Sequence, residues 1–252
     1  MNELAKINCT LSKKQLTHIV GMAKAFRPDP VIMRFNKDGL RMSLLDPSES
    51  CMMVYHVLET KFEFYDVQPS EGKDEIELCL GADKLAEAVK VMTKESVQLS
   101  YDGVAPKLSM KSGRTTRTVP TYYPEKAYRK DIPQPKLTSS FKLPANDALD
   151  TFEKTKTVSE FIAIFLMGGK LTIHAGDTLG EIETNFDPDE TQHNSVDAKS
   201  LYTVGFMLDM LCGVTGKEDV HFQFGDAMPM FVSYSNDTGD YMAIAAPRIE
   251  TE

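Results

Sequence analysis

Two distant segments of this 252-residue chain share one order of features. Residues 92–110 read MTKESVQLSYDGVAPKLSM, and residues 214–234 read VTGKEDVHFQFGDAMPMFVSY. Each has a Thr/Lys/Glu turn, an alternating strand pattern, a Gly/Asp loop, a proline and a second strand pattern. The apolar positions of the first strand coincide: Val97, Leu99 and Tyr101 in one segment, Val220, Phe222 and Phe224 in the other. Such a repeat predicts two copies of one domain, with chance likeness between two β-rich segments as the alternative.

A second pair of matching features precedes each segment. A hairpin turn ending at Gly39 separates VIMRF from LRMSLL, and one ending at Gly169 separates FIAIFL from KLTIHA. Helical periodicity occurs twice in each half, at 12–26 and 81–92, and at 145–156 and 198–211. Ser12 is the expected N-cap of the first helix and Asn146 that of the third. Few helices and many strands predict an α+β fold, with two helices covering one face of the sheets in each domain.

Prolines without any periodic pattern mark the joint between the halves. Pro120, Pro124, Pro133 and Pro135 fall in a segment that predicts an interdomain linker over 120–135. The domains are then expected at 1–119 and 136–252.

Composition bounds the class of protein. The formal net charge of −9 argues against nucleic acid on average charge, although segregated basic residues would escape this argument. No run approaches ~18 uncharged apolar residues, so no membrane span is expected, and the acidic start MNELAKINCT does not resemble a secretory signal. Four scattered cysteines, Cys9, Cys51, Cys79 and Cys212, favour reduced thiols in a cytoplasmic protein.

No catalytic motif is present. GGK at 168–170 lacks the remainder of a phosphate loop, the five histidines are scattered, and no serine or cysteine has an elbow-like glycine context. The acidic run 187–190 is interpreted as a solvated loop rather than a cation site. We therefore expect no enzyme, no metal and no cofactor. A ligand-binding β-rich protein or an uncharacterised enzyme is the alternative, which would need a deep pocket with convergent polar groups.

Basic residues gather on the expected helices. If all four helices cover one side of the sheets, that side is more basic than the chain as a whole; the alternative is an ordinary solvated helix face. The lysines that lie on or beside these helices and form the candidate DNA-binding set are Lys13, Lys14, Lys24, Lys84, Lys90, Lys154, Lys156 and Lys217.

Two strand regions carry opposite charge. The basic one is 107–119, KLSMKSGRTTRTV, and the acidic one is 176–190, GDTLGEIETNFDPDE. Charges of this kind protect exposed sheet edges from aggregation. Alternatively, a basic edge meets an acidic edge across a subunit boundary, which makes a ring if the rotation closes. The residues expected at that boundary are Lys111, Arg114, Arg117, Asp177, Glu181 and Glu183.

Three segments carry a resemblance to a known family. GLRMSLLDPSES at 39–50, KSLYTVGFMLDMLCGV followed by FGDAMPMFVSY at 199–234, and the closing AAPRIE resemble the sliding clamps called proliferating cell nuclear antigen (PCNA), in their archaeal type. The resemblance implies a homotrimeric ring of duplicated clamp domains, with sheets outside and helices lining a channel around double-stranded DNA. It implies a processivity factor that contacts phosphates without reading bases. One subunit of a heterotrimeric clamp, replicative or checkpoint-type, is the alternative.

The resemblance also implies partners and a docking pocket. DNA polymerase, clamp loader, flap endonuclease and DNA ligase would insert a short apolar and aromatic motif, in the cytoplasm beside the nucleoid, or in the nucleus of a eukaryote. Departures from the family are the basic linker residues Lys126, Arg129 and Lys130, and Ile244 where an aromatic residue is common. Carried over to this chain, the pocket residues are Leu45, Ser50, Met52, Ile132, Pro133, Ile244, Ala246, Pro247 and Ile249.

Overall fold

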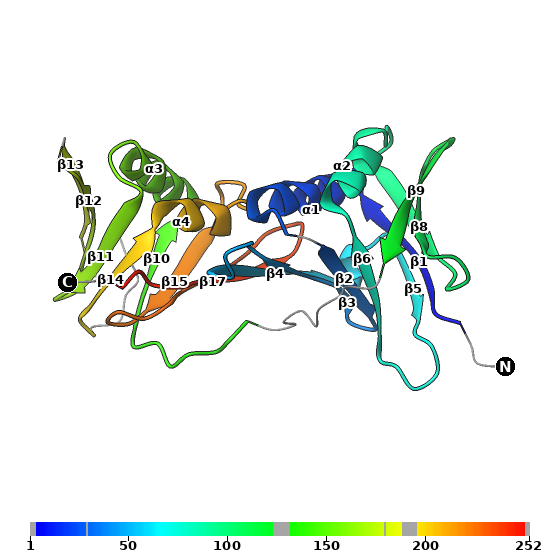
Figure 1. Ribbon diagram of the computed structural model, residues 1–252, viewed down its shortest axis with the longest axis horizontal. Coiled ribbons are helices and arrows are strands. Elements are labelled where there is room, and N and C mark those ends of the chain that lie inside the picture. Colours follow the sequence, from blue (N-terminus) through cyan, green and yellow to red (C-terminus); the bar gives the residue numbers. More distant parts are fainter. Residues whose placement is uncertain (1–3, 29, 123–131, 179, 188–195, 250–252) are drawn as a thin grey trace. The chain divides into compact units, whose positions relative to one another are not determined.

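The computed structural model describes residues 4–28, 30–122, 132–178, 180–187 and 196–249 (Figure 1). The chain forms two compact units. The first comprises Met1–Pro47, Val54–Asp131 and Asp237–Asp240, and the second comprises Ser48–Met53, Ile132–Asn236 and Tyr241–Glu252. The basic linker residues Lys126, Arg129 and Lys130 lie outside the described residues, so the linker boundaries remain a prediction.

The first unit is built from strands with two helices and one short 3-10 helix. Its elements are β1 (Lys6–Ser12), α1 (Lys13–Phe26), β2 (Val31–Asn36), β3 (Gly39–Leu45), β4 (Cys51–Leu58, with Val54 onward in this unit), η1 (Glu59–Lys61), β5 (Phe64–Gln68), β6 (Glu75–Leu80), α2 (Ala82–Lys90), β7 (Ser96–Tyr101), β8 (Lys107–Ser112) and β9 (Thr115–Tyr122).

The strands of this unit run in the order β4-β3-β2-β6-β9-β8-β7-β1-β5. The junction of β6 with β9 is short, because they pair only through Cys79 with Tyr122 and Leu80 with Thr121. Helices α1 and α2 pack against each other and lie on one side of the strands (Figure 1). They bury an apolar stripe that includes Leu16 and leave their charged faces in solvent, as amphipathic helices do.

The second unit repeats this plan. Its elements are β10 (Ser139–Pro144), α3 (Ala145–Lys156), β11 (Phe161–Met167), β12 (Lys170–Gly176), β13 (Glu181–Phe186), β14 (Ala198–Thr203), α4 (Val204–Met210), β15 (Asp219–Phe224), β16 (Met230–Ser235) and β17 (Asp240–Ala245, with Tyr241 onward in this unit). One sheet has the order β13-β12-β11-β14, and the other strands run β10-β15-β16-β17.

The strand orders confirm the internal repeat. In the second unit β13-β12-β11-β14 matches β4-β3-β2-β6 of the first, and β17-β16-β15-β10 matches β9-β8-β7-β1. The segments that match in sequence, β7 and β15, hold equivalent positions beside the first strand of each unit. The Gly169 hairpin is also confirmed, because Met167 pairs with Lys170 across Gly168 and Gly169, which both have positive φ.

One of the two expected N-caps is confirmed. Ser12 Oγ accepts a hydrogen bond from Gln15 N at 3.2 Å, and Gln15 Oε1 accepts one from Ser12 N at 2.9 Å, a complete capping box. The prediction of Asn146 is wrong. Helix α3 begins two residues earlier, at Ala145 after Pro144, and its first N–H is satisfied by the carbonyl of Glu218 at 2.9 Å. A neighbouring turn thus replaces the side-chain cap.

Two other element predictions need correction. Residues 198–203 form β14 rather than the start of a helix, because they pair antiparallel with β11 and bury Ala198, Ser200 and Tyr202 at every second position. The basic region 107–119 is a hairpin of β8 and β9 rather than one strand, with Gly113 at φ +60° in the turn. Strand β9 also continues to Tyr122, into the start of the expected linker.

Candidate functional site

The lysines of the first unit stand on the solvent side of its helices. Lys14 and Lys24 on α1, and Lys84 and Lys90 on α2, are exposed, while Lys13 is half-buried at the first position of α1. This is the expected face, because the opposite side of each helix packs on the strands. Arg27 is a further exposed cation on this side that was not predicted from the sequence; it caps the C-terminus of α1 with φ 47° in the left-handed region.

The second unit presents fewer cations. Lys154 and Lys156 are exposed on the last turn of α3, and Lys217 is exposed in the turn before β15. Helix α4 carries no lysine or arginine. The Glu218 carboxylate fixes the turn, because it accepts hydrogen bonds from the backbone N–H groups of Thr215 and Lys217 and from the Thr215 hydroxyl. Burial raises the pKa of Glu218, but these hydrogen bonds outweigh burial and hold the pKa at about 2.

Three of the eight lysines are already engaged by carboxylates. The ion pairs are Lys14 with Asp237 at 2.6 Å, Lys84 with Glu87 at 3.3 Å and Lys154 with Asp150 at 2.5 Å. The hydrogen bond from Lys14, together with its charge, lowers the pKa of Asp237. Within the described part of the chain, the remaining five form no ion pair: Lys13, Lys24, Lys90, Lys156 and Lys217.

The two charged regions both lie at sheet edges. Strand β13 ends its sheet and pairs only with β12. Strand β9 pairs with β8 along its length but reaches β6 only at Thr121 and Tyr122, so its first residues have an open side. All six predicted boundary residues are exposed. Four of them have partners within their own unit. Arg117 lies 3.8 Å from Glu87, and Glu181 lies 3.7 Å from His174. The Asp177 and Glu183 carboxylates accept hydrogen bonds from Gly180 N and Asn185 Nδ2.

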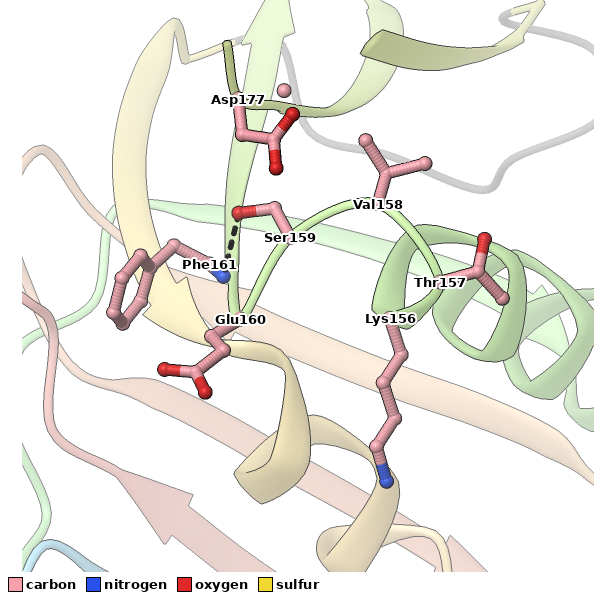
Figure 2. Close-up of a pocket in the computed structure, with 8 residues that line it drawn as sticks. Lys156, Thr157, Val158, Ser159, Glu160, Phe161 and Asp177 are labelled. Carbon is pink, nitrogen blue, oxygen red and sulfur yellow. Dashed lines mark hydrogen bonds between the residues drawn. The ribbon is translucent and has the colours of Figure 1, made fainter. Parts of the chain in front are cut away.

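One open hollow adjoins the β9 edge, and another lies in the second unit. One is lined by α2 and β9 residues that include Lys90, Val91 and Arg117. The other, shown in Figure 2, lies between the end of α3 and the ends of β11 and β12. There the Ser159 hydroxyl accepts a hydrogen bond from Phe161 N, and Lys156 extends away from Asp177 (Figure 2). This hollow presents no converging acid, base and nucleophile of the kind that catalysis requires.

The segment after β17 is fastened to the second unit. Ala246 N donates to the Ser50 carbonyl at 2.8 Å, and Arg248 N donates to the Leu201 carbonyl at 2.7 Å. The Arg248 guanidinium also lies over the ring of Phe161. The sequence analysis missed this last contact, because nothing in the sequence brings the two residues together.

The expected pocket residues divide by exposure. Ile249 is 81% exposed, and Pro133 and Ala246 are exposed as well. Ser50, Ile244 and Pro247 are half-buried, whereas Met52 and Ile132 are buried. All of these belong to the second unit, and Leu45, at the end of β3, belongs to the first. The structure therefore joins Ser50 and Ala246 through a backbone hydrogen bond and leaves the apolar side chain of Ile249 exposed to solvent.

The described ranges also bear on metal ligation and on thiol reactivity. They contain no group of three or more His, Cys, Asp or Glu side chains placed to hold a metal ion. Burial raises the pKa of the Cys9 thiol to about 12, so it stays protonated and unreactive at neutral pH. None of the helices in the described ranges is long and apolar enough to cross a membrane.

Comparison with known proteins gives a consistent result. No protein-family model matches the chain. DNA polymerase sliding clamp 1 of Thermococcus kodakarensis is 21% identical over 233 residues, which are 88% of this chain and 90% of that protein. A. fulgidus PCNA, solved with the C-terminal region of FEN-1 bound, superposes with a TM-score of 0.86 at 19% identity over 98% of this chain and 100% of that one.

A second solved structure has the same fold and comes from a heteromeric assembly. The PCNA2–PCNA3 complex of Sulfolobus tokodaii contains a chain that superposes with a TM-score of 0.79 at 18% identity, covering 96% of this chain and all of that one. The superpositions extend over nearly the whole chain. By sequence the chain is similar to the archaeal DNA polymerase sliding clamps over most of its length, and its fold is that of the solved PCNA structures.

Proposed function

We propose that this chain encircles duplex DNA as a sliding clamp, gives a replicative DNA polymerase its processivity and serves as a docking platform for replication and repair enzymes. It acts as a scaffold and not as an enzyme. The observation that carries the proposal is the match, along nearly the whole chain, to proteins named DNA polymerase sliding clamp. The duplicated domain with its helices on one side supports it.

A protein of net negative charge can bind DNA if its basic residues are gathered on one face. Exposed lysines stand on α1 and α2 in the first unit and on α3 in the second, and a phosphate backbone passing those helices would release counterions as it meets them. Contacts of this kind carry no sequence information. Topological linkage through a closed ring, rather than affinity, then keeps the protein on DNA while it slides.

Ring closure uses the two open edges. The basic β9 edge of one copy would pair with the acidic β13 edge of the next, so each copy contributes one edge to each of two contacts. Such a heterologous contact closes into a ring when the rotation permits. Two adjacent strands also satisfy the backbone groups that an exposed edge leaves unpaired. We propose a homotrimer on this basis.

Partner docking uses the segment after β17. Its backbone is fixed by the bonds to Ser50 and Leu201, and Ile249 stands exposed beside it. DNA polymerase, clamp loader, flap endonuclease and DNA ligase would each present a short motif whose apolar and aromatic side chains cover this surface. The FEN-1 segment bound to A. fulgidus PCNA supports docking of this kind. We place the protein in the cytoplasm beside the nucleoid, or in the nucleus if the source is eukaryotic.

A heterotrimeric clamp subunit is the second candidate. The likeness to a chain of the Sulfolobus tokodaii PCNA2–PCNA3 complex favours it, whereas a basic and an acidic edge on one chain favour self-assembly.

The native mass in solution separates the two candidates. Light scattering across micromolar dilutions is expected to give about three times 28.1 kDa for a self-closing ring. A persistent monomer would favour the heterotrimer. Primer extension with a cognate polymerase and a clamp loader then tests the function itself: longer products per binding event are expected, and unchanged products would contradict a clamp.

A further inference from the structure

Two carboxylates of this protein form ion pairs with lysines that face the proposed DNA path. We propose that Asp237 and Asp150 compete with DNA phosphates for Lys14 and Lys154, and thereby hold down the affinity of this clamp for duplex DNA. The proposal rests on the function proposed above. It adds that the weakness of the DNA contact is set by particular acidic residues.

The Lys14–Asp237 pair joins residues that are far apart in the sequence. Lys14 lies in the first turn of α1, and Asp237 lies in the loop before β17. The Lys14 amine and the Asp237 carboxylate are 2.6 Å apart, yet the two side chains are 52% and 67% exposed. Both charges are therefore within reach of a phosphate group as well as of each other.

The Asp237 carboxylate is held in place by its neighbours. The Tyr55 hydroxyl donates a hydrogen bond to the Thr238 carbonyl at 2.7 Å, and Thr238 is only 2% exposed. Gly239 packs so tightly that an added Cβ would lie 2.5 Å from the carbonyl oxygen of His56. A backbone fixed immediately after Asp237 lets its carboxylate meet Lys14 with less loss of chain entropy than a carboxylate on a free loop would incur.

The Lys154–Asp150 pair is local to α3. The two residues are one helical turn apart, with the acid nearer the N-terminus, which is the favourable orientation for such a pair. Their side chains are 58% and 60% exposed. Lys156, two residues along the same helix, has no ion pair within the described part of the chain.

The strength of exposed ion pairs suits a competitive role. An exposed ion pair of this kind changes an equilibrium constant by about 1.5- to 5-fold. A DNA phosphate can therefore displace either carboxylate from its lysine, but the affinity for DNA is lowered by the same factor. When a phosphate takes the lysine, the released carboxylate attracts a cation, which offsets the counterion that the DNA gives up. The paired lysines then add little to the salt dependence of binding. The lysines that form no ion pair then provide most of the electrostatic attraction for DNA.

Two substitutions remove the competitors without removing any lysine. Asp237→Asn and Asp150→Asn are each expected to tighten binding of a short labelled duplex by about 1.5- to 5-fold. Each is also expected to steepen the slope of log K against log salt by about 0.9, because one more lysine releases a counterion. Glu87 is left intact, since its carboxylate also contacts Arg117 on the open strand β9.

A double-substitution cycle separates pairing from a general charge effect. Lys14→Ala is expected to weaken duplex binding more in the Asp237→Asn protein than in the unaltered protein, because only there is the lysine free to begin with. Lys24 lies on the same helix but forms no ion pair in the described ranges. Lys24→Ala should therefore weaken duplex binding equally in the unaltered protein and in the Asp237→Asn protein. Glu153→Gln removes one exposed negative charge beside Lys154 without breaking an ion pair, and controls for long-range charge.

The outcomes distinguish the inference from the proposed function. Equal costs of Lys14→Ala in the two backgrounds, or equal tightening by Glu153→Gln and Asp150→Asn, would overturn the inference while the clamp function stands. Failure of the unaltered ring to bind the duplex at any salt concentration would contradict both. Circular dichroism of each variant confirms that the exposed substitutions leave the fold intact.

Discussion

The guanidinium of Arg248 lies over the aromatic ring of Phe161, 3.6 Å from its centroid. Together with the hydrogen bond from Arg248 N to the Leu201 carbonyl, this contact fixes the segment that follows β17 on the sheet that contains β11 and β14. Ile249 comes next and is almost bare. The side chain of Arg248 therefore helps to determine where Ile249, the residue proposed to contact partners, is held.

Arg248→Ala should weaken partner-peptide binding by loosening this segment. A cation over an aromatic ring at an exposed site is worth about 0.5–1 kcal/mol, so the dissociation constant should rise about two- to fivefold. Calorimetric titration with a short apolar and aromatic peptide measures this. Lys170→Ala, which removes an exposed cation from the same sheet, is the control. Equal affinities for all three proteins would show that the Phe161 contact does not order the segment.

Ile249→Ala tests the docking surface directly. The side chain is 81% exposed in the free protein, and its burial by a partner removes apolar area from water. We expect a loss of about 1–2 kcal/mol in peptide affinity and no change in retention on closed circular DNA. Peptide titration measures the expected loss of affinity, and a DNA-retention assay in parallel checks that retention is unchanged. A loss of retention with unchanged peptide affinity would place the pocket elsewhere.

Charge reversal on β9 should weaken the ring. Arg114→Glu with Arg117→Glu would set like charges against Glu181 and Glu183 of the next copy, and we expect the dissociation constant of the ring to rise about tenfold or more. Light scattering on dilution measures it. A chain that also carries Glu181→Lys and Glu183→Lys should recover assembly. Unchanged assembly of the first variant would exclude a charged β9–β13 contact.

The Glu218 carboxylate gives the second unit a pH-dependent term. Its pKa falls from an ordinary 4.5 to about 2, so it contributes stability that is present above pH 4.5 and is lost as pH falls towards 2. The contribution is about 3 kcal/mol at most. Glu218→Gln should lower the free energy of unfolding at pH 7, and the difference from the unaltered protein should narrow below pH 4.5. Urea titrations at several pH values measure this, and a constant difference would contradict it.

The sequence alone predicted the elements whose signal is local. The Ser12 capping box needs only residues 12 and 15, and the two-residue turn at Gly168 and Gly169 needs only glycines that tolerate positive φ. The amphipathic pattern of α1 similarly predicted that Lys14 and Lys24 face solvent. The prediction from sequence was wrong at Asn146 and at 198–203, because contacts from outside each segment decide the local structure there. The carbonyl of Glu218 takes the place of a cap, and pairing with β11 makes a strand.

The duplication and the α+β class were thus determined by the order of the residues, because local periodicity and turn chemistry act over a few positions. The tertiary structure alone decided which charges meet. Lys14 finds Asp237 and Phe161 finds Arg248 only after strands from distant parts of the sequence have been aligned. An ion pair or a ring contact depends on separation in space, and local sequence patterns do not encode that separation until the core has packed.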